Sequence, residues 1–221
     1  FSVTIAPLTA LWDFTGGTER MPTDEERLAA LPLVDDDALV LGENSTVTLP
    51  AGMQLDLGGI AKGYIADRMA DKVRGLTQGA MLNFGGNVYA VGTRPDGSPW
   101  RVGVQDPRLE NETIGTLLVS DTSVITAGAY QRFFERDGIT YHHIMDPNTG
   151  YPASSGLLSV TVITVDGTAG DVLSTAMFVM GLDASIEYWK AHDGVEAVFV
   201  LEDGTVYYTE NVPWESVSPY W

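Results

Sequence analysis

From about residue 80 onward, the sequence is a succession of short apolar and β-branched runs separated by turns rich in Gly, Asp and Pro. Runs of this kind between turn residues are typical of β-strands. The predicted strands are Ala80–Phe84, Val88–Val91, Arg101–Val104, Thr116–Val119, Val124–Thr126, Tyr130–Glu135, Thr140–Met145 and Val160–Val165. Near the end, Val195–Leu201 and Thr205–Glu210 flank Glu202-Asp-Gly204, which predicts a hairpin.

Helical patterns are confined to a few places. Thr23 and Glu26 have the spacing of a capping box before an apolar run, which predicts a short helix. The other predicted helices follow Gly58-Gly59 and cover Gly170–Met180 and Ala184–His192. Short strands are predicted at Leu39–Leu41, Thr46–Leu49 and Met53–Leu57. Because the helices are grouped and do not alternate strictly with the strands, the sequence predicts an α+β fold with mixed or antiparallel sheets.

The length of 221 residues is enough for one sizeable core or for two intimately packed subdomains, and we predict a single domain over residues 1–221. The chain opens on an apolar segment without a charged leader, which we interpret as a start within a domain. No apolar run approaches the roughly 20 residues that span a bilayer, so no transmembrane segment is predicted.

The net charge of −18, from 30 acidic and 12 basic residues, argues against a nucleic-acid or anionic-membrane partner. An anionic substrate must therefore be bound locally, by individual cations or backbone N–H groups. The absence of cysteine excludes disulfides, thiolate metal sites and cysteine nucleophiles.

The segment Asp56-Leu-Gly-Gly-Ile-Ala-Lys62-Gly63 joins a predicted strand to a predicted helix. Glycines at a helix N-terminus let backbone N–H groups approach an anion. Lys62 falls in the first helical turn, where a cation is unfavourable to the helix dipole unless an anion binds nearby. The alternative is a tight turn with a surface lysine.

The segment Asn83-Phe-Gly-Gly-Asn87 lies between two predicted strands. It is either a bend that contacts a ligand or, more commonly for such a sequence, a glycine-marked bulge.

Two histidines precede the turn Asp146-Pro-Asn-Thr-Gly150 at the end of an otherwise apolar run. In strand geometry His143 and Met145 share one face and His142 points the opposite way, so the two histidines form no metal clamp. A histidine titrates near neutral pH and suits a general base.

Asp171 and Thr175 are four residues apart on a predicted helix, so their side chains lie on the same face. A carboxylate and a hydroxyl on an apolar helix are costly to bury without a partner, and a hard cation such as magnesium would satisfy both. The alternative is an N-cap aspartate with a threonine bonded to the helix backbone. With the glycine-rich turn and a histidine base, the pair indicates magnesium-assisted phosphoryl chemistry.

The order of these segments resembles the ApbE family of FAD:protein FMN transferases. The matching segments are Asp56-Leu-Gly-Gly-Ile-Ala-Lys-Gly-Tyr, Asn83-Phe-Gly-Gly-Asn, Ile125-Thr-Ala-Gly-Ala-Tyr, His143-Ile-Met-Asp-Pro-Asn-Thr-Gly and Asp171-Val-Leu-Ser-Thr. The resemblance extends from Phe1 to about Gly181 and implies an α+β fold. It also implies transfer of FMN from FAD to a Ser or Thr hydroxyl of a target protein, with release of AMP.

The resemblance implies a role for each matching residue. Magnesium would be bound by Asp171, Thr175 and the carbonyl of Gly59, with Ser174 at a position that is acidic in some members. FAD would be contacted by Asp56, Lys62, Met145 and Ser2, the last standing where an aspartate is common. His143 would be the base for the incoming hydroxyl.

Three further expectations follow from the resemblance. The usual N-terminal region of the family is missing from this sequence. Family members are commonly exported or lipid-anchored, which predicts an extracytoplasmic location. Two other activities stay open, a FAD pyrophosphatase giving FMN and AMP and a non-catalytic flavin-binding module.

Overall fold

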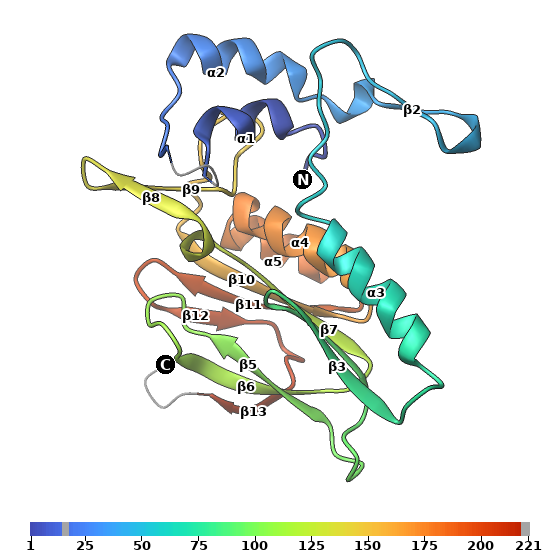
Figure 1. Cartoon of the computed structure of the whole chain (residues 1–221). Coiled ribbons are helices and arrows are strands. Elements are labelled where there is room, and N and C mark those ends of the chain that lie inside the picture. Colours follow the sequence, from blue (N-terminus) through green and yellow to red (C-terminus); the bar gives the residue numbers. More distant parts are fainter. Residues whose placement is uncertain (15–17, 218–221) are drawn as a thin grey trace. The chain divides into compact units, whose positions relative to one another are not determined.

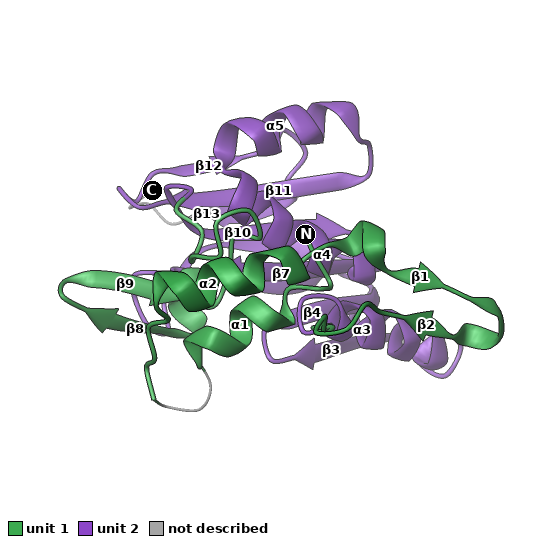
Figure 2. Ribbon diagram, turned by 90° about the horizontal axis from the view of Figure 1, so that it is seen from above, with its two compact units in different colours: residues 1–57, 129–154 green, residues 58–128, 155–221 purple. Residues whose placement is uncertain are grey.

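The structure is a computed structural model that describes residues 1–14 and 18–217. The chain forms two compact units, coloured separately in Figure 2. Unit 1 consists of residues 1–57 and 129–154, and unit 2 of residues 58–128 and 155–221. The prediction of a single flavin transferase domain stays a prediction.

The centre of unit 2 is a six-stranded antiparallel sheet. Its strands, in spatial order, are β12 (Val206–Tyr208), β11 (Val195–Leu201), β10 (Leu157–Thr164), β7 (Thr122–Gly128), β4 (Asn87–Gly92) and β3 (Gly79–Phe84). Strand β10 is buried at nearly every position, because it is covered on both faces of the sheet.

Helices cover one face of this sheet, as Figure 1 shows. Helix α4 (Gly167–Met180) packs on β7 and β10, and α3 (Ala61–Val73) packs on β3, β4 and α4. Helix α5 (Leu182–Ala191) packs on α4 and β11.

A three-stranded sheet covers the other face and shares its hydrophobic core with the larger sheet. Its strands, in spatial order, are β13 (Trp214–Val217), β6 (Thr113–Val119) and β5 (Trp100–Gln105). The shared core includes Val104, Ile114 and Leu117 from the small sheet and Val124 and Val198 from the large one.

Unit 1 is built from helices and two hairpins. Its elements are α1 (Ala6–Trp12), α2 (Asp24–Ala30), β1 (Val40–Leu41), β2 (Val47–Thr48), β8 (Phe133–Arg136), β9 (Ile139–His142) and the 3-10 turns Leu31–Leu33, Asp36–Ala38, Glu43–Ser45 and Ala129–Gln131. Its core is an aromatic cluster in which Trp12 stacks on Phe14 and Tyr141 and meets Tyr151 edge-on. Such pairs stabilise beyond their buried area, by about 0.5–1.5 kcal/mol each.

The predicted α+β class is confirmed, and so is the capping box. The hydroxyl of Thr23 accepts from the N–H of Glu26 at 3.2 Å, and the Glu26 carboxylate accepts from the N–H of Thr23 at 2.9 Å. The strand predicted at Met53–Leu57 is wrong. The N–H of Asp56 donates to the carbonyl of Val3, but Val3 lies in a turn and a single bond of this kind forms no strand ladder.

Two other predicted strands are shorter than expected. Tyr130–Glu135 begins as a 3-10 turn, and only β8 from Phe133 is extended. Thr140–Met145 ends as a strand at His142, because the hairpin partner of His142 is the first residue of β8; beyond it Met145 forms an isolated bridge with Pro152. Helix α1 and strand β13 were not predicted.

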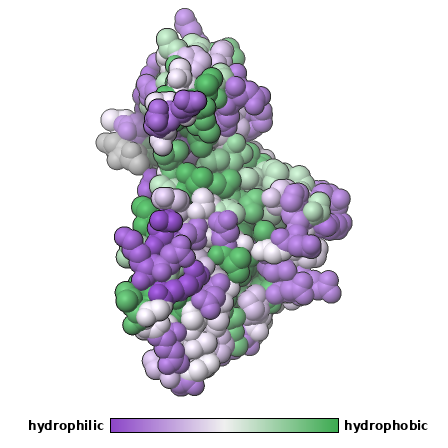
Figure 3. All heavy atoms as spheres, turned by 90° about the vertical axis from the view of Figure 1, so that its right-hand side faces the viewer, coloured by the Kyte–Doolittle hydropathy of each residue, from purple (hydrophilic) through white to green (hydrophobic). Residues whose placement is uncertain are grey.

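On the molecular face in Figure 3, hydrophilic and hydrophobic residues are interspersed. Among the described residues, no helix is both long and apolar enough to cross a membrane.

Candidate active site

Asp171 lies in the second turn of α4 and is almost completely buried, with 4% of its surface exposed. Its Oδ1 accepts a hydrogen bond from Asn87 Nδ2 at 2.8 Å, and its Oδ2 accepts from the backbone N–H of Gly63 at 2.9 Å. Within residues 1–14 and 18–217, no lysine, arginine or histidine forms an ion pair with this carboxylate. A buried carboxylate is costly unless its charge is compensated, so this position favours a bound cation.

Asn87 also contacts the lysine of the glycine-rich segment. Its Oδ1 accepts from Lys62 Nζ at 3.3 Å. Lys62, Asn87, Asp171 and Gly63 therefore form one hydrogen-bonded chain at the N-terminus of α3, although they are far apart in sequence.

The turn between β3 and β4 places Asn87 in this chain. Gly85 and Gly86 both have positive φ, 63° and 98°, and form a two-residue hairpin loop closed by the pairing of Phe84 with Asn87. Positive φ at both loop positions is the geometry that the right-handed twist of a hairpin favours, and glycine adopts it without strain. The interpretation of these glycines as a bulge is therefore wrong.

The other predicted metal ligands lie in the same unit. Thr175 is half-buried, one turn after Asp171 on α4, so the predicted helical pair is present. Gly59 lies two residues before the first residue of α3, one turn from Gly63. Ser174 is buried and its hydroxyl donates to the carbonyl of Asp171 at 3.0 Å, which accounts for its burial without an ion.

Two close-packed glycines bring α3 and α4 together at this point. A Cβ added to Gly63 would lie 2.1 Å from the carbonyl oxygen of Gly167, and one added to Gly167 would lie 2.7 Å from Asp67 Oδ1. A side chain at Gly63 would meet a backbone atom and would push the helices apart, whereas one at Gly167 would displace the end of the Asp67 side chain.

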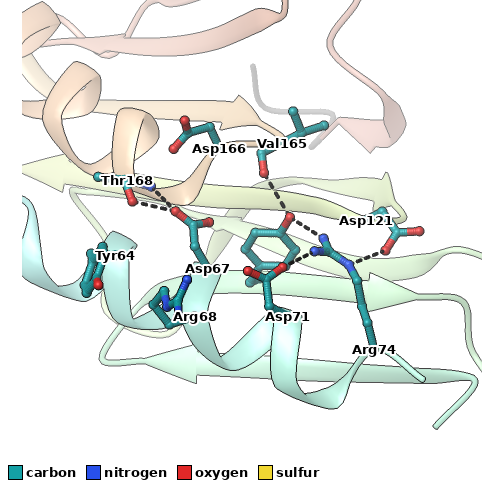
Figure 4. Close-up of a pocket in the computed structure, with 10 residues that line it drawn as sticks. Tyr64, Asp67, Arg68, Asp71, Arg74, Asp121, Val165, Asp166 and Thr168 are labelled. Atoms are coloured by element: carbon teal, nitrogen blue, oxygen red, sulfur yellow. Dashed lines mark hydrogen bonds and ion pairs between the residues drawn. The ribbon is translucent and has the colours of Figure 1, made fainter. Parts of the chain in front are cut away.

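Each helix also caps the N-terminus of the other. Asp171 of α4 accepts from the third N–H of α3, while Asp67 of α3 accepts from the N–H groups of Gly167 and Thr168 at 2.8 and 2.7 Å. The first N–H groups of a helix have no partner within the helix and carry its partial positive charge, so a carboxylate is favoured there. Figure 4 shows Asp67 pointing to Thr168.

A pocket of about 420 Å³ lies beside α3. It is lined by Tyr64, Asp67, Arg68, Asp71, Arg74 and Asp121 among others. Its charged groups are largely paired with one another. Arg74 contacts Asp71 at 2.7 Å and donates to the hydroxyl of Tyr89 at 2.8 Å, and Tyr89 donates to the carbonyl of Val165. Lys62 and Asp171 do not line this pocket, and the contacts of Arg74, Asp71 and Tyr89 are structural.

The two adjacent histidines have different environments. His142 closes β9, is 7% exposed, and its Nε2 bonds the carbonyl of Ala153 at 3.1 Å. His143 lies just beyond β9 and is half-buried; its Nδ1 is 3.3 Å from the carbonyl of Arg132, and its backbone N–H donates to the same oxygen. Since a carbonyl only accepts, Nδ1 of His143 carries the proton and the lone pair of the neutral ring is on Nε2.

Burial lowers the pKa of His142 below its ordinary value of 6.5, and the bond to Ala153 partly offsets this effect. The unfolded chain therefore binds more protons than the folded one, so the free energy of unfolding decreases as the pH falls below about 6.5. We expect His142→Gln, which keeps a donor but does not titrate, to lose less stability between pH 7.5 and 5.5. Urea unfolding at both pH values measures this, with His192→Gln as the control; equal losses in His142→Gln and the native chain would contradict the role of His142.

The predicted flavin contacts of unit 1 fall in two places. Ser2 donates to Asp36 at 3.1 Å, and the carbonyl of the next residue, Val3, accepts from the backbone N–H of Asp56, so Ser2 and Asp56 lie close together. Met145 lies two residues after His143 with its side chain in the aromatic cluster beside Trp12 and Phe134.

Tertiary contacts within unit 1 hold the turn that follows His143 and Met145. The indole N–H of Trp12 donates to the carbonyl of Gly150 at 3.1 Å, and Arg27 donates to the carbonyl of Thr149 at 2.6 Å. Arg27 also lies over the ring of Tyr151, 4.5 Å from its centroid. A half-buried arginine and an indole therefore order a segment whose own sequence specifies only a turn.

Sequence reasoning did not assign a role to Asn87. The only local signal was its place directly after two glycines, because its partners are 25 and 84 residues away.

Comparison with known proteins places these residues in a family. A family model described as "ApbE family" matches residues 1–199. A FAD:protein FMN transferase of Klebsiella pneumoniae (strain 342) is 37% identical over 207 residues, covering 92% of this chain and 64% of the relative. One of Treponema pallidum (strain Nichols) is 34% identical over 223 residues, covering 93% and 62%. The chain thus spans less than two thirds of the length of these two relatives.

Two solved structures have the same fold. The ApbE protein of Thermotoga maritima superposes with a TM-score of 0.87 at 38% identity, covering 95% of this chain and 70% of that one. The apo form of the flavinyl transferase ApbE of Pseudomonas stutzeri has a TM-score of 0.82 at 33% identity, covering 95% and 67%.

Proposed function

This chain belongs to the ApbE family, and on that premise we propose that it transfers FMN from FAD to a Ser or Thr hydroxyl of an acceptor protein. In this reaction the hydroxyl oxygen bonds to the phosphorus on the FMN side, the pyrophosphate P–O bond breaks, AMP leaves, and the hydroxyl proton passes to a base. Relatives named FAD:protein FMN transferase at 37% and 34% identity support the proposal.

The observation that carries the proposal is the buried carboxylate of Asp171 beside the N-terminus of α3, with Lys62 held nearby through Asn87. In an acidic protein with a net charge of −18, a buried carboxylate and a nearby ammonium would bind a cation and an anion, respectively. A magnesium-bound pyrophosphate needs both.

The donor set fits magnesium. Among the described residues, no group of three or more His, Asp or Glu side chains could hold a metal, so an ion here depends on one carboxylate and neutral oxygens. Magnesium is commonly held this way, with water and substrate phosphate completing its octahedron. Asp171, Thr175 and the carbonyl of Gly59 would hold it, with Ser174 next to them. When bound, it would neutralise charge on the pyrophosphate and on the transferring phosphoryl group.

The remaining roles belong to residues that bind FAD and move a proton. Lys62 would contact the pyrophosphate, and Ser2, Asp56 and the backbone of Met145 would contact FAD. His143 would accept the hydroxyl proton at Nε2, because the carbonyl of Arg132 holds the other ring nitrogen in its protonated form.

Incubation with FAD, MgCl2 and a candidate acceptor protein tests the proposal. We expect AMP release together with a covalently fluorescent acceptor, and loss of both when EDTA removes the metal. AMP without a fluorescent acceptor would instead identify a FAD pyrophosphatase, and FAD binding without AMP would identify a flavin-binding module.

For His143→Ala we expect FMN transfer to fall by about 10²–10⁴-fold, the usual contribution of a general base, while FAD binding is retained. Stopped assays of acceptor fluorescence measure the rate, and calorimetry measures FAD binding. His192→Ala is the matched control, because His192 lies at the end of α5, where it stacks on Tyr188. Unchanged transfer by His143→Ala would exclude His143 as the base.

A further inference from the structure

We propose that Asn87 is a positioning residue that holds Lys62 and Asp171 close together while keeping their charges apart; this inference rests on the proposed function. Asn87 is 2% exposed and contacts both side chains, Lys62 at 3.3 Å and Asp171 at 2.8 Å. It stands outside the set of metal and flavin ligands described above, and it touches neither substrate nor metal in this proposal.

The chemistry of the partners determines how the amide of Asn87 is oriented. An ammonium group only donates hydrogen bonds and a carboxylate only accepts them, so Oδ1 must face Lys62 and Nδ2 must face Asp171. Asparagine is the natural side chain of this size that offers one acceptor and one donor in a planar group. Aspartate would lose the donor and leucine would lose both.

The consequence is that the two charges do not neutralise each other. Among the described residues, Lys62 and Asp171 form no ion pair with each other, since the amide lies between them. A direct salt bridge would satisfy both groups and weaken the attraction of each for its ligand. With the amide between them, the carboxylate stays available to a cation and the ammonium to a phosphate.

The backbone around Asn87 restricts its side chain. It is the first residue of β4, paired with Phe84 across the two-glycine loop, and the following residues of the strand pair with β7. A ligating carboxylate whose own hydrogen bonds are fixed binds metal more tightly, and removing such an outer contact typically costs about 10–100-fold in metal affinity or activity.

We therefore expect Asn87→Ala to raise the Mg²⁺ concentration for half-maximal FAD cleavage by about 10–100-fold. The KM for FAD should change less, because Lys62 itself is still present. A readout that does not depend on turnover is the rise in melting temperature when MgCl2 is added in the presence of ADP, which carries the same pyrophosphate group. For Asn87→Ala, the MgCl2 concentration that gives half of this rise in melting temperature should also increase by about 10–100-fold.

Asn83→Ala is the matched control. Asn83 is exposed in the same hairpin, and its side chain accepts from the N–H of Gly86 at 2.9 Å; within the part of the chain that the structure describes, it has no hydrogen bond to Lys62 or Asp171. We expect the Mg²⁺ dependence of FAD cleavage by Asn83→Ala to equal that of the native chain. Asn87→Leu, which keeps the branched shape of the side chain and leaves no cavity, should behave as Asn87→Ala and guards against a result due to a cavity alone.

The outcomes separate this inference from the proposed function. If the native chain shows neither Mg²⁺-dependent cleavage nor a Mg²⁺-dependent melting shift, the proposed function fails. If the native chain shows both and folded Asn87→Ala matches it, the positioning role of Asn87 is wrong. Failure of both Asn87 variants to fold, as judged by circular dichroism, would also overturn the inference by making Asn87 a structural residue.

Discussion

Asp171→Asn is expected to reduce Mg²⁺-dependent FAD cleavage by about 10³-fold or more while leaving the protein folded. The substitution keeps the shape of the side chain and removes its negative charge, which is the only charge among the proposed metal ligands. Metal stabilisation of transition-state charge is worth several kcal/mol, and ~4 kcal/mol corresponds to about 10³-fold in rate. The rate of AMP release at saturating FAD and MgCl2 measures the effect.

The fold should tolerate this change. The side-chain amide that replaces the carboxylate can still accept from one of the two donors, Gly63 N–H or Asn87 Nδ2, and the cost of burying a charge disappears. MgCl2 with ADP should no longer raise the melting temperature, because binding stabilises a protein only where the folded state binds the ligand.

The matched control is Asp166→Ala on the same helix. Asp166 is exposed and accepts from the N–H of Ala169 at 2.8 Å as the N-cap of α4. Losing this cap should cost about 1 kcal/mol of stability with cleavage preserved. Full activity in a folded Asp171→Asn protein would show that the metal assignment is wrong.

Gly63→Ala is expected to have the largest effect on stability, a loss of about 2–4 kcal/mol in the free energy of unfolding. The added Cβ would lie 2.1 Å from the carbonyl oxygen of Gly167 and 2.8 Å from Cβ of Asp171. The carbonyl oxygen of Gly167 belongs to the backbone, so the whole of α4 must shift away from α3. The shift also weakens the hydrogen bond from Gly63 N–H to Asp171, which should impair metal binding as well.

This result opposes what helix propensity alone predicts. Alanine is favoured over glycine within a helix by about 1 kcal/mol, so an isolated α3 would become more stable. Arg68→Ala, at an exposed position of the same helix, is the control and should change stability by less than about 0.5 kcal/mol. Chemical denaturation measures both variants, and a Gly63→Ala protein as stable as the native chain would contradict the close helix contact.

The two predictions are linked because the site and the α3–α4 contact share residues. Asp171 caps α3 and is also the proposed metal ligand, while Asp67 caps α4 in return. The close approach at Gly63 and Gly167 makes both caps possible. A substitution at this contact should therefore change stability and metal binding together, whereas one at Asp166 should change stability alone.

Several features of the protein were determined by the sequence itself. The capping box of Thr23 and Glu26, the hairpin across Glu202-Asp-Gly204 and the helical spacing of Asp171 and Thr175 were all predicted and are present. These features depend on residues two to five positions apart, so backbone geometry and turn preference are enough to predict them.

Other features were decided only by the tertiary structure. The contact of Asp171 with Gly63 spans 108 residues and that with Asn87 spans 84, and no local pattern specifies either. The difference between buried His142 and half-buried His143 depends on where β9 ends, which is set by its pairing with β8. Periodicity shows which residues share a face of one element. Which residues of different elements meet depends on how α3, α4 and the sheet pack, because burying their apolar faces together brings the polar groups at their ends into contact.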